Sequence, residues 1–357
     1  MKQRILTSII ALSLLAAMPA WGQTQVIKRV ATQKTKNTNQ SKWFYQDEFH
    51  DGMARVGKTN MEVGFIDSSG KVVVPPGKWK NAGDFSEGLA WVVNDSDKLG
   101  YIDTTGSLVI PCQWKRHWHF SESFCNGLAA VMDFNDKFGY IDRSGTVVIP
   151  TQFQYAGKFE NGLSLVRKNY RWGMIDKTGN IAVPIEWDEL EGLSCGLAKA
   201  KKSKLWGYID KTGAQIIHGQ WKYAESFSEE LAAVHNEKWG FIDKAGKVVI
   251  PYKWQEVKSF HEGFAAVKEN GKWGFIDKTG AVVFPCKWKG AYWFSEGLAA
   301  VQDNNERWGC IDKKGNLVLP CKWRDGVEFG YPKKGLAIVY EFNGRKHIIN
   351  KKGQIVK

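Results

Sequence analysis

The sequence predicts an all-β protein, built as a tandem array of about nine three-stranded antiparallel β-units over residues 43–357. Three observations predict it: turn glycines at an almost fixed spacing, short β-favouring runs separated by hairpin turns, and the absence of any long stretch with helical periodicity. The glycines are 33 to 39 residues apart, at Gly70, Gly106, Gly145, Gly179, Gly213, Gly246, Gly280, Gly315 and Gly353. Such a period is typical of repeat architectures, in which each unit packs on its neighbours.

Three motifs keep phase with these glycines. Most repeats open with an F-x-x-G-L-A box, as at residues 85–90 and 294–299, and continue with W-G-[FYM]-I-D, as at Trp172, Trp206, Trp239 and Trp273. A V-V-[IF]-P-x-x-W stretch closes the repeat, as at residues 248–254 and 282–288. The repeats start near Phe49, Phe85, Phe124, Phe159, Leu193, Phe227, Phe260, Phe294 and Pro332.

The repeat that starts at Phe260 shows why each element is expected to be a strand. Its three β-favouring runs, FAAVKE, KWGFID and AVVFP, are separated by Asn270-Gly271 and by Lys278-Thr279-Gly280, which are hairpin turn sequences. In the middle strand Trp273 points to one face and Gly274 to the other. We expect a bulky ring, from the closing Trp column, to lie across the bare backbone of that glycine.

The repeated aspartate of the middle motif is predicted to cap a turn. In D-K-T-G the carboxylate accepts hydrogen bonds from the backbone of following residues, and Gly takes the left-handed conformation. The ninth repeat has Asn350 there, which can cap a turn but cannot act as a general base. The predicted caps are Asp67, Asp103, Asp142, Asp176, Asp210, Asp243, Asp277 and Asp312.

Tryptophan is the unusual component of the composition, with 17 residues. Burying one Trp is worth roughly 4 to 6 kcal/mol at most, from about 150–250 Å² at about 25 cal/mol per Å². A unit of this size cannot bury such a face alone, so neighbouring units must stack. We therefore interpret the repeated Trp residues as core, with ligand stacking as the alternative.

These residues resemble the bacterial WG-repeat (KWG-repeat) proteins. The likeness rests on repeated K-W-G-[FY]-I-D-K-x-G, with F-x-E-G-L-A before it and V-V-I-P-x-x-W after it, and covers about residues 43–357. It implies a β-rich repeat array that is often exported, with neither an enzymatic activity nor a defined ligand. Val63, Leu99 and Phe138 depart from the pattern, because they replace the middle Trp.

The array is expected to be an open, curved solenoid, with a propeller-like closed ring as the alternative. A propeller usually closes by pairing strands from both chain ends in one blade, whereas here the first repeat begins with its first strand and the last ends with its third. About nine repeats also exceed the usual range of about four to eight propeller blades.

The N-terminus is predicted to be a signal peptide over residues 1–22, followed by a polar basic linker over residues 23–42. A basic start, the apolar run at residues 5–17 and Ala20-Trp21-Gly22 are typical of a secretory signal. The array itself contains no apolar run long enough for a transmembrane helix. The expected location is therefore periplasmic or extracellular, and the protein is expected not to span the membrane.

Charge and cysteine content exclude some partners. The formal net charge of +13 falls to +6 for residues 43–357 once the basic residues of the signal and linker are set aside, and what remains is scattered. Export and the lack of a basic block argue against nucleic acid as a partner. There is no C-x-x-C motif, and Cys112, Cys286 and Cys321 share one small apolar position of the repeat. Cys112 and Cys125 flank one loop and are the first pair to test for a disulfide.

Candidate binding residues lie where the repeat pattern breaks. The segment between Pro111 and Phe124 is four residues longer than its counterparts, and exposed loops on a rigid scaffold often carry binding residues. Its basic and aromatic side chains suit sugar stacking or protein contact, and simple packing on a neighbour is the plain alternative. His-x-His without a third ligand does not establish a metal site, so neither metal nor cofactor is predicted. The candidates are Lys115, Arg116, His117, Trp118 and His119, with Tyr292 and Trp293 of a later connecting segment.

An enzymatic function has little support in the sequence. Serine-hydrolase, zinc-protease and phosphate-loop motifs are all missing. Glu186, Asp188, Glu189 and Glu191 form one dense acidic cluster, from which a glycosidase pair could be chosen. We therefore predict a secreted or periplasmic, non-catalytic scaffold that binds a protein or glycan, with a glycan-processing hydrolase or a purely structural envelope protein as alternatives.

Overall fold

The computed structural model of the chain describes residues 43–59, 62–117, 122–330 and 333–356. The predicted signal peptide and linker lie outside these residues. The chain divides into two compact parts, residues 1–116 and 117–357, which are described separately. Within the described ranges, no helix has the length and apolarity needed to cross a membrane.

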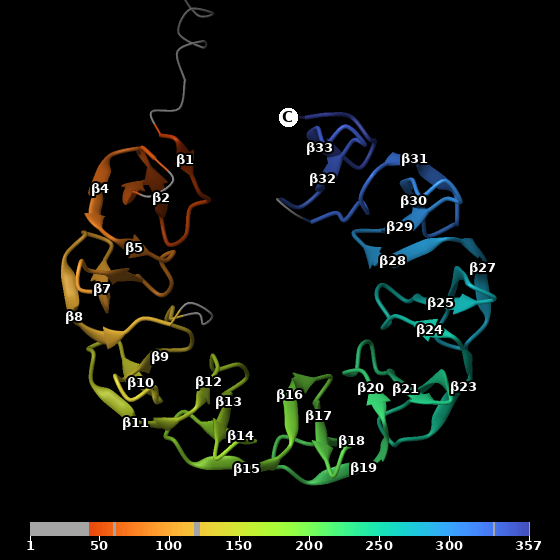
Figure 1. The fold of residues 1–357 in the computed structure, drawn as a ribbon, viewed down its shortest axis with the longest axis horizontal. Helices are drawn as coiled ribbons and strands as arrows, with labels where there is room; N and C mark the ends of the chain where they lie inside the picture. The colour runs from red at the N-terminus through yellow and green to blue at the C-terminus, as the bar shows by residue number, and fades with distance from the viewer. Residues whose placement is uncertain (1–42, 60–61, 118–121, 331–332, 357) are drawn as a thin grey trace, which may run out of the picture. The chain divides into compact units, whose positions relative to one another are not determined.

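The N-terminal part contains two sheets whose strands pair in chain order and antiparallel (Figure 1). The first sheet consists of β1 (Tyr45–Gln46), β2 (Met53–Gly57), β3 (Val63–Asp67) and β4 (Val72–Trp79). The second consists of β5 (Asn81–Ala82), β6 (Leu89–Val93), β7 (Lys98–Asp103) and β8 (Leu108–Lys115).

The C-terminal part repeats the same antiparallel arrangement along the chain (Figure 1). Its first strands are β9 (Leu128–Met132), β10 (Phe138–Asp142) and β11 (Val147–Phe153), followed by the sheet β12 (Tyr155–Ala156), β13 (Leu163–Lys168), β14 (Arg171–Asp176) and β15 (Ile181–Trp187). The next two sheets are β16 (Glu189–Ser194), β17 (Leu197–Lys202), β18 (Leu205–Ile209), β19 (Gln215–Trp221), and β20 (Tyr223–Ala224), β21 (Ala232–Asn236), β22 (Lys238–Ile242), β23 (Val248–Trp254). Another sheet consists of β24 (Glu256–Val257), β25 (Ala265–Glu269), β26 (Lys272–Ile276) and β27 (Val282–Trp288). The next consists of β28 (Gly290–Ser295), β29 (Leu298–Gln302), β30 (Trp308–Asp312) and β31 (Leu317–Trp323). The last is the two-stranded sheet of β32 (Leu336–Tyr340) and β33 (Lys346–Asn350).

The predicted all-β tandem array of antiparallel units is confirmed. The three predicted strands of a repeat are present, and most sheets gain a short strand that was not predicted, such as β12, β20 or β24. This extra strand comes from the segment that connects the closing Trp of one repeat to the box of the next. The choice between an open solenoid and a closed ring stays a prediction.

The turns follow the predicted chemistry. Asn270 and Gly271 both have positive φ, 50° and 75°, as a two-residue type I′ hairpin requires. In the next turn Oδ1 of Asp277 accepts hydrogen bonds from the Thr279 N–H at 2.9 Å, the Thr279 hydroxyl at 2.6 Å and the Ala281 N–H at 3.1 Å. The carboxylate therefore closes the hairpin between the second and third strands.

The glycine of W-G has a different role from the one expected. A Cβ atom on Gly274 would lie 2.6 Å from the Phe284 carbonyl oxygen and 2.7 Å from the Cys286 nitrogen, both in the backbone of β27. The β26–β27 pairing has a register shift at this point, so β27 bulges toward the glycine. The prediction that a Trp ring lies across Gly274 is wrong, because the neighbouring strand backbone takes that space.

The two tryptophans of a repeat are instead direct cross-strand partners. Trp239 pairs with Trp254, and Trp273 pairs with Trp288, in the register of the second and third strands. Trp254 is fully buried, and Trp273 is 8% exposed. Core packing thus accounts for these rings, as side-by-side aromatic residues stabilise an antiparallel pair.

A second aromatic pair joins successive repeats. The box Phe of one repeat packs against the Phe or Tyr that follows W-G in the preceding repeat, with ring centroids 4.7 to 5.3 Å apart. The pairs are Phe65–Phe85, Tyr140–Phe159, Tyr208–Phe227, Phe241–Phe260 and Phe275–Phe294. Tilted and edge-on ring pairs of this kind stabilise the contact beyond the area that they bury.

Candidate functional site

The segment that carries Tyr292 and Trp293 contains an irregularity in its strand pairing. In β28, Ala291 pairs with Val301 and Phe294 with Ala299, so one extra residue is accommodated between them. A β-bulge of this kind redirects side chains out of the regular alternation. Tyr292 is 39% exposed and Trp293 is half-buried.

Tyr292 and Trp293 belong to a group of rings and cations on two consecutive repeats. The Tyr292 ring stacks on Trp308, with centroids 4.9 Å apart and planes at 17°, and meets Trp293 edge-on at 6.0 Å. Trp293 in turn stacks on His261 at 5.5 Å. We call this group the aromatic cluster; it comprises Lys258, His261, Trp273, Tyr292, Trp293 and Trp308.

The absence of a side chain at Gly290 makes the Tyr292 stack possible. A Cβ atom at Gly290 would lie 2.9 Å from the Trp308 ring. In the sheet of β12–β15 the corresponding residue is Tyr155, whose own ring contacts Trp172 at 5.0 Å. In the β28–β31 sheet, Tyr292 reaches back over Gly290 and takes the place of such a ring.

Lys258 places a positive charge among three of these rings. Its Nζ lies 5.5 Å from the centroid of Tyr292, 5.7 Å from Trp273 and 5.9 Å from Trp293. A cation near an aromatic face gains about 0.5–1 kcal/mol at exposed sites. The lysine therefore helps to fix the ring positions, and its ammonium group carries N–H donors.

The chemical capacity of the aromatic cluster is recognition. It offers the exposed part of the Tyr292 ring, an ammonium donor and an imidazole whose Nδ1 lies 3.1 Å from the Ser259 carbonyl oxygen. Within the described residues, no group of three or more His, Cys, Asp and Glu side chains is placed to hold a metal ion.

The longer segment after Pro111 is described only in part. Lys115 ends β8 opposite Lys98, and the Arg116 guanidinium lies 5.8 Å from the centroid of the Trp91 ring. His117, in the C-terminal part, donates its backbone N–H to Glu122 at 3.0 Å and packs its ring edge-on against Phe138 at 5.6 Å. Trp118 and His119 lie outside the described residues.

The acidic cluster at the β15–β16 connection consists of ion pairs. Glu186 lies 2.9 Å from Lys202, Glu189 lies 2.7 Å from Lys201, and Glu191 lies 2.8 Å from Lys199. Asp188 pairs with Arg171. Each carboxylate thus faces a cation of its own, in contrast to the paired acid and base of a glycosidase.

The six cysteines are all free thiols, and the Cys112–Cys125 pair forms no disulfide. Cys310 is buried within β30, and burial raises the pKa of its thiol to about 12. The position shared by Cys112, Cys286 and Cys321 is half-buried. In the repeat of Cys286 this position lies directly over the W-G glycine, since a Cβ atom on Gly274 would lie 2.8 Å from the Cys286 sulfur.

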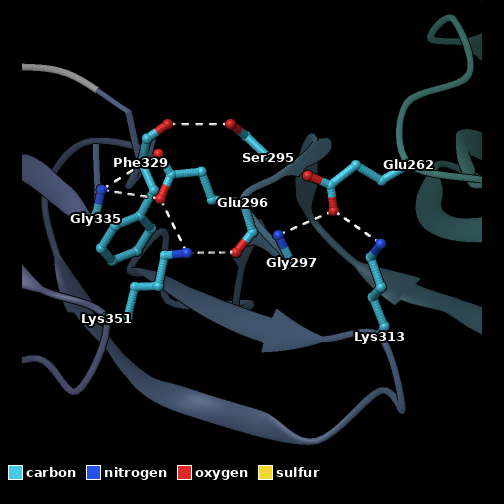
Figure 2. A network of polar contacts seen from close by, with 8 residues as sticks. All are labelled: Glu262, Ser295, Glu296, Gly297, Lys313, Phe329, Gly335 and Lys351. Atoms are coloured by element: carbon cyan, nitrogen blue, oxygen red, sulfur yellow. Dashed lines mark hydrogen bonds and ion pairs between the residues drawn. The ribbon is translucent and has the colours of Figure 1, made fainter. Parts of the chain in front are cut away.

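The box motif carries contacts between repeats that sequence reasoning missed (Figure 2). The Ser295 hydroxyl donates to the Phe329 carbonyl oxygen at 3.0 Å, and Glu296 accepts from the Gly335 N–H at 2.9 Å and from Lys351 at 2.9 Å. The same pattern occurs one repeat earlier, where Glu262 accepts from Gly297 and Lys313. These residues connect the box of one repeat to the box and Asp-turn of the next.

The signal that could have revealed these contacts is a glutamate in an unfavourable backbone position. Glu229, Glu262 and Glu296 have φ between 51° and 53°, a conformation that favours Asn or Gly over Glu. Asn126 and Asn161 occupy the corresponding position in other repeats. The acidic side chain at this site reaches the backbone of the next repeat, as Asp51 also does when it accepts the Gly88 N–H at 2.8 Å.

Comparison with known proteins gives a family for the chain. No curated protein matches the chain. Among solved structures, BamB from Moraxella catarrhalis is 12% identical, covers 87% of this chain and 92% of its own, and gives a TM-score of 0.37. The computationally designed Ika8 protein is 10% identical, covers 66% of this chain and 84% of its own, and gives 0.42. PorZ, a surface component of the type-IX secretion system of Porphyromonas gingivalis, is 10% identical, covers 87% of this chain and 51% of its own, and gives a TM-score of 0.29.

These TM-scores are too low for the three structures to bear on function. The family model for the WG containing repeat, by contrast, matches eight segments in succession: residues 64–96, 100–137, 138–172, 172–206, 206–237, 239–273, 273–306 and 308–344. They cover most of the array, in phase with the sheets described above. The chain therefore belongs to the family of WG-repeat proteins.

Proposed function

We propose that this WG-repeat protein is an exported, non-catalytic scaffold that binds a glycan at the aromatic cluster. The observation that carries the proposal is the 39% exposed Tyr292 ring, held in place by its stack on Trp308. Export rests on the signal-like sequence at residues 1–22.

Tyr292 and Trp293 differ from the residues at the same positions of other repeats. The residues at the same two positions of other connecting segments are Gly83-Asp84, Gly157-Lys158, Glu225-Ser226 and Lys258-Ser259. Tyr292 takes the place of the Tyr155-type ring against its Trp, whereas Trp293 has no aromatic counterpart in these segments. Exposed aromatic residues that the core does not use are typical of recognition surfaces.

A sugar ring suits this surface. The C–H groups on the apolar face of a pyranose pack against the electron-rich face of an aromatic ring, and Trp293 and Tyr292 offer such faces at 67° to each other. Lys258 can donate a hydrogen bond to a hydroxyl at the edge of the sugar, and Nε2 of His261 can accept one, because Nδ1 of this ring donates to the Ser259 carbonyl oxygen. A short glycan that follows both rings would therefore be held by stacking and oriented by polar contacts.

A non-catalytic role is supported by the ion pairs that the clustered acidic side chains form. The carboxylates from which a glycosidase pair would be chosen each face Lys or Arg, as Glu189 faces Lys201 at 2.7 Å. Such pairs suit a surface network that fixes the β16 edge. The alternative of a hydrolase would require two carboxylates with different protonation states across one substrate bond.

Retention on polysaccharides tests the proposal. The mature protein and a Tyr292→Ala/Trp293→Ala variant are passed over insoluble glycans, including peptidoglycan sacculi, chitin and cellulose. The matched control is Tyr223→Ala, which removes a 51% exposed tyrosine from an equivalent segment. We expect the control to be retained like the unchanged protein and the double variant to be lost. Equal retention of all three would refute the site.

A protein partner is the second candidate, favoured by exposed aliphatic residues on the third strands. Val248, Val249, Val282 and Val283 are 38–48% exposed on β23 and β27. Aliphatic side chains in such a row suit a protein surface better than a sugar. Val249→Lys/Val283→Lys would then abolish capture of a protein from envelope extract without affecting retention on glycans.

A further inference from the structure

At one junction between repeats, both members of the aromatic pair are replaced. The pair consists of the aromatic residue after W-G in one repeat and the box Phe of the next. In the sequence, both are replaced only at Met174 and Leu193. Elsewhere one ring at least is kept, as in the Cys310–Phe329 combination. The junction between the β12–β15 and β16–β19 sheets therefore lacks two rings at once.

A cavity of about 520 Å³ lies at this junction, and Met174 and Leu193 both line it. Leu163 and Leu165 complete its apolar wall, and both are half-buried. The volume is within the range of about 300–1,000 Å³ that small-molecule sites occupy. Met174 is 2% exposed and packs with Leu193 in the core of this junction, so the cavity opens to the surface beside this apolar pair.

The mouth of the cavity is polar. Tyr155, Lys158, Glu160 and Asn161 also line it, and the last three are exposed. An apolar wall with a few polar groups at the opening is the usual composition of a site for a small molecule with one apolar end.

We propose that this cavity binds an aromatic ring that carries a polar substituent, with the ring against the apolar wall beside Met174 and Leu193 and the substituent at the mouth. The Met174 thioether favours an aromatic occupant, because sulfur–ring contacts add about 0.3–1.5 kcal/mol to apolar burial. The neighbouring junctions show that a ring fits between two such sheets, as Phe227 does against Tyr208 at 4.7 Å. The site is separate from the aromatic cluster and does not depend on it.

Methyl NMR of the mature protein with labelled methionine tests the proposal, with p-cresol as probe. A ring bound in the cavity shifts the Met174 methyl signal by its ring current, in a saturable way. The fully saturated analogue 4-methylcyclohexanol has the same heavy atoms but no aromatic ring, and we expect it to bind about two- to tenfold more weakly. Met132, buried in β9, reports that the fold is intact.

Two variants fill the cavity from opposite sides. In Leu193→Phe the new ring occupies the site, so p-cresol no longer shifts the Met174 methyl signal. In Met174→Phe the loss is followed by saturation transfer to p-cresol, which needs no methionine. Leu205→Phe, the same change at a 39% exposed position, is the control and keeps binding.

Three results would overturn the proposal. They are the absence of a saturable shift of the Met174 methyl signal in the unchanged protein, equal binding of p-cresol and its saturated analogue, and unchanged p-cresol binding in a folded Leu193→Phe or Met174→Phe variant. If Leu193→Phe alone fails to fold, Met174→Phe decides.

Discussion

Phe260→Ala tests whether the aromatic pairs hold successive repeats together. Phe260 is fully buried and meets Phe241 nearly edge-on, with centroids 4.9 Å apart and planes at 64°. Truncating a buried Phe costs about 3–5 kcal/mol. The ring pair accounts for about 0.5–1.5 kcal/mol of this loss, and the remainder comes from lost burial and the cavity left behind. The Ser228 hydrogen bond to the Phe260 carbonyl oxygen, 2.6 Å, involves the backbone and is retained.

Urea unfolding and hydrogen exchange measure the effect. Because repeats contact mainly their neighbours, the variant should lose exchange protection first in the sheets on either side of this junction, β20–β23 and β24–β27. Phe342→Ala, at a 58% exposed position, is the control and should change stability by less than about 0.5 kcal/mol. A loss for Phe260→Ala below about 1 kcal/mol would refute the argument that ring pairs connect the repeats.

Three further outcomes are expected. The Thr279 hydroxyl and backbone N–H groups lower the pKa of Asp277. The ionised carboxylate therefore adds stability above its unfolded pKa of about 3.9, and this stability is lost as the pH falls through the folded pKa. The urea midpoint of Asp277→Ala should vary less with acid than that of the unchanged protein, and Asp277→Asn should retain most of the turn. Glu296→Gln removes the charge that faces Lys351 and should speed hydrogen exchange in β32 and β33, whereas Glu306→Gln, on an exposed turn, should leave those strands unchanged. Cys310, whose pKa burial raises to about 12, should react with iodoacetamide at pH 8 only when the chain unfolds, and modification at the rate of a free thiol would contradict its buried position.

The strands of a repeat could be predicted because their signals are local. Asn270-Gly271 specifies a hairpin by its backbone preference, and the Asp277 turn needs only residues that are four positions apart or closer. The short strands such as β20, Tyr223–Ala224, could not be predicted in this way. Two residues carry no periodic pattern, and their pairing with β21 depends on where the preceding repeat ends.

The candidate site could be predicted only in part. Tyr292 and Trp293 stood out because they break the repeat pattern, but their partners Lys258 and His261 come from the preceding connecting segment and box. The cavity at Met174 and Leu193 was missed, although both substitutions are visible in the sequence. Their significance appears only once these two positions, 19 residues apart, are known to face each other across a junction.

The sequence by itself determined the repeat, its all-β class and the turn chemistry, because periodicity and turn preferences act between residues close in the chain. Only the tertiary structure decided which side chains meet between repeats: the Glu296 contacts with Gly335 and Lys351, the ring stack of Tyr292 on Trp308, and the open space beside Met174. The physical reason is that each of these features depends on side chains from two or more strands at once, and on the stacking of one sheet against the next.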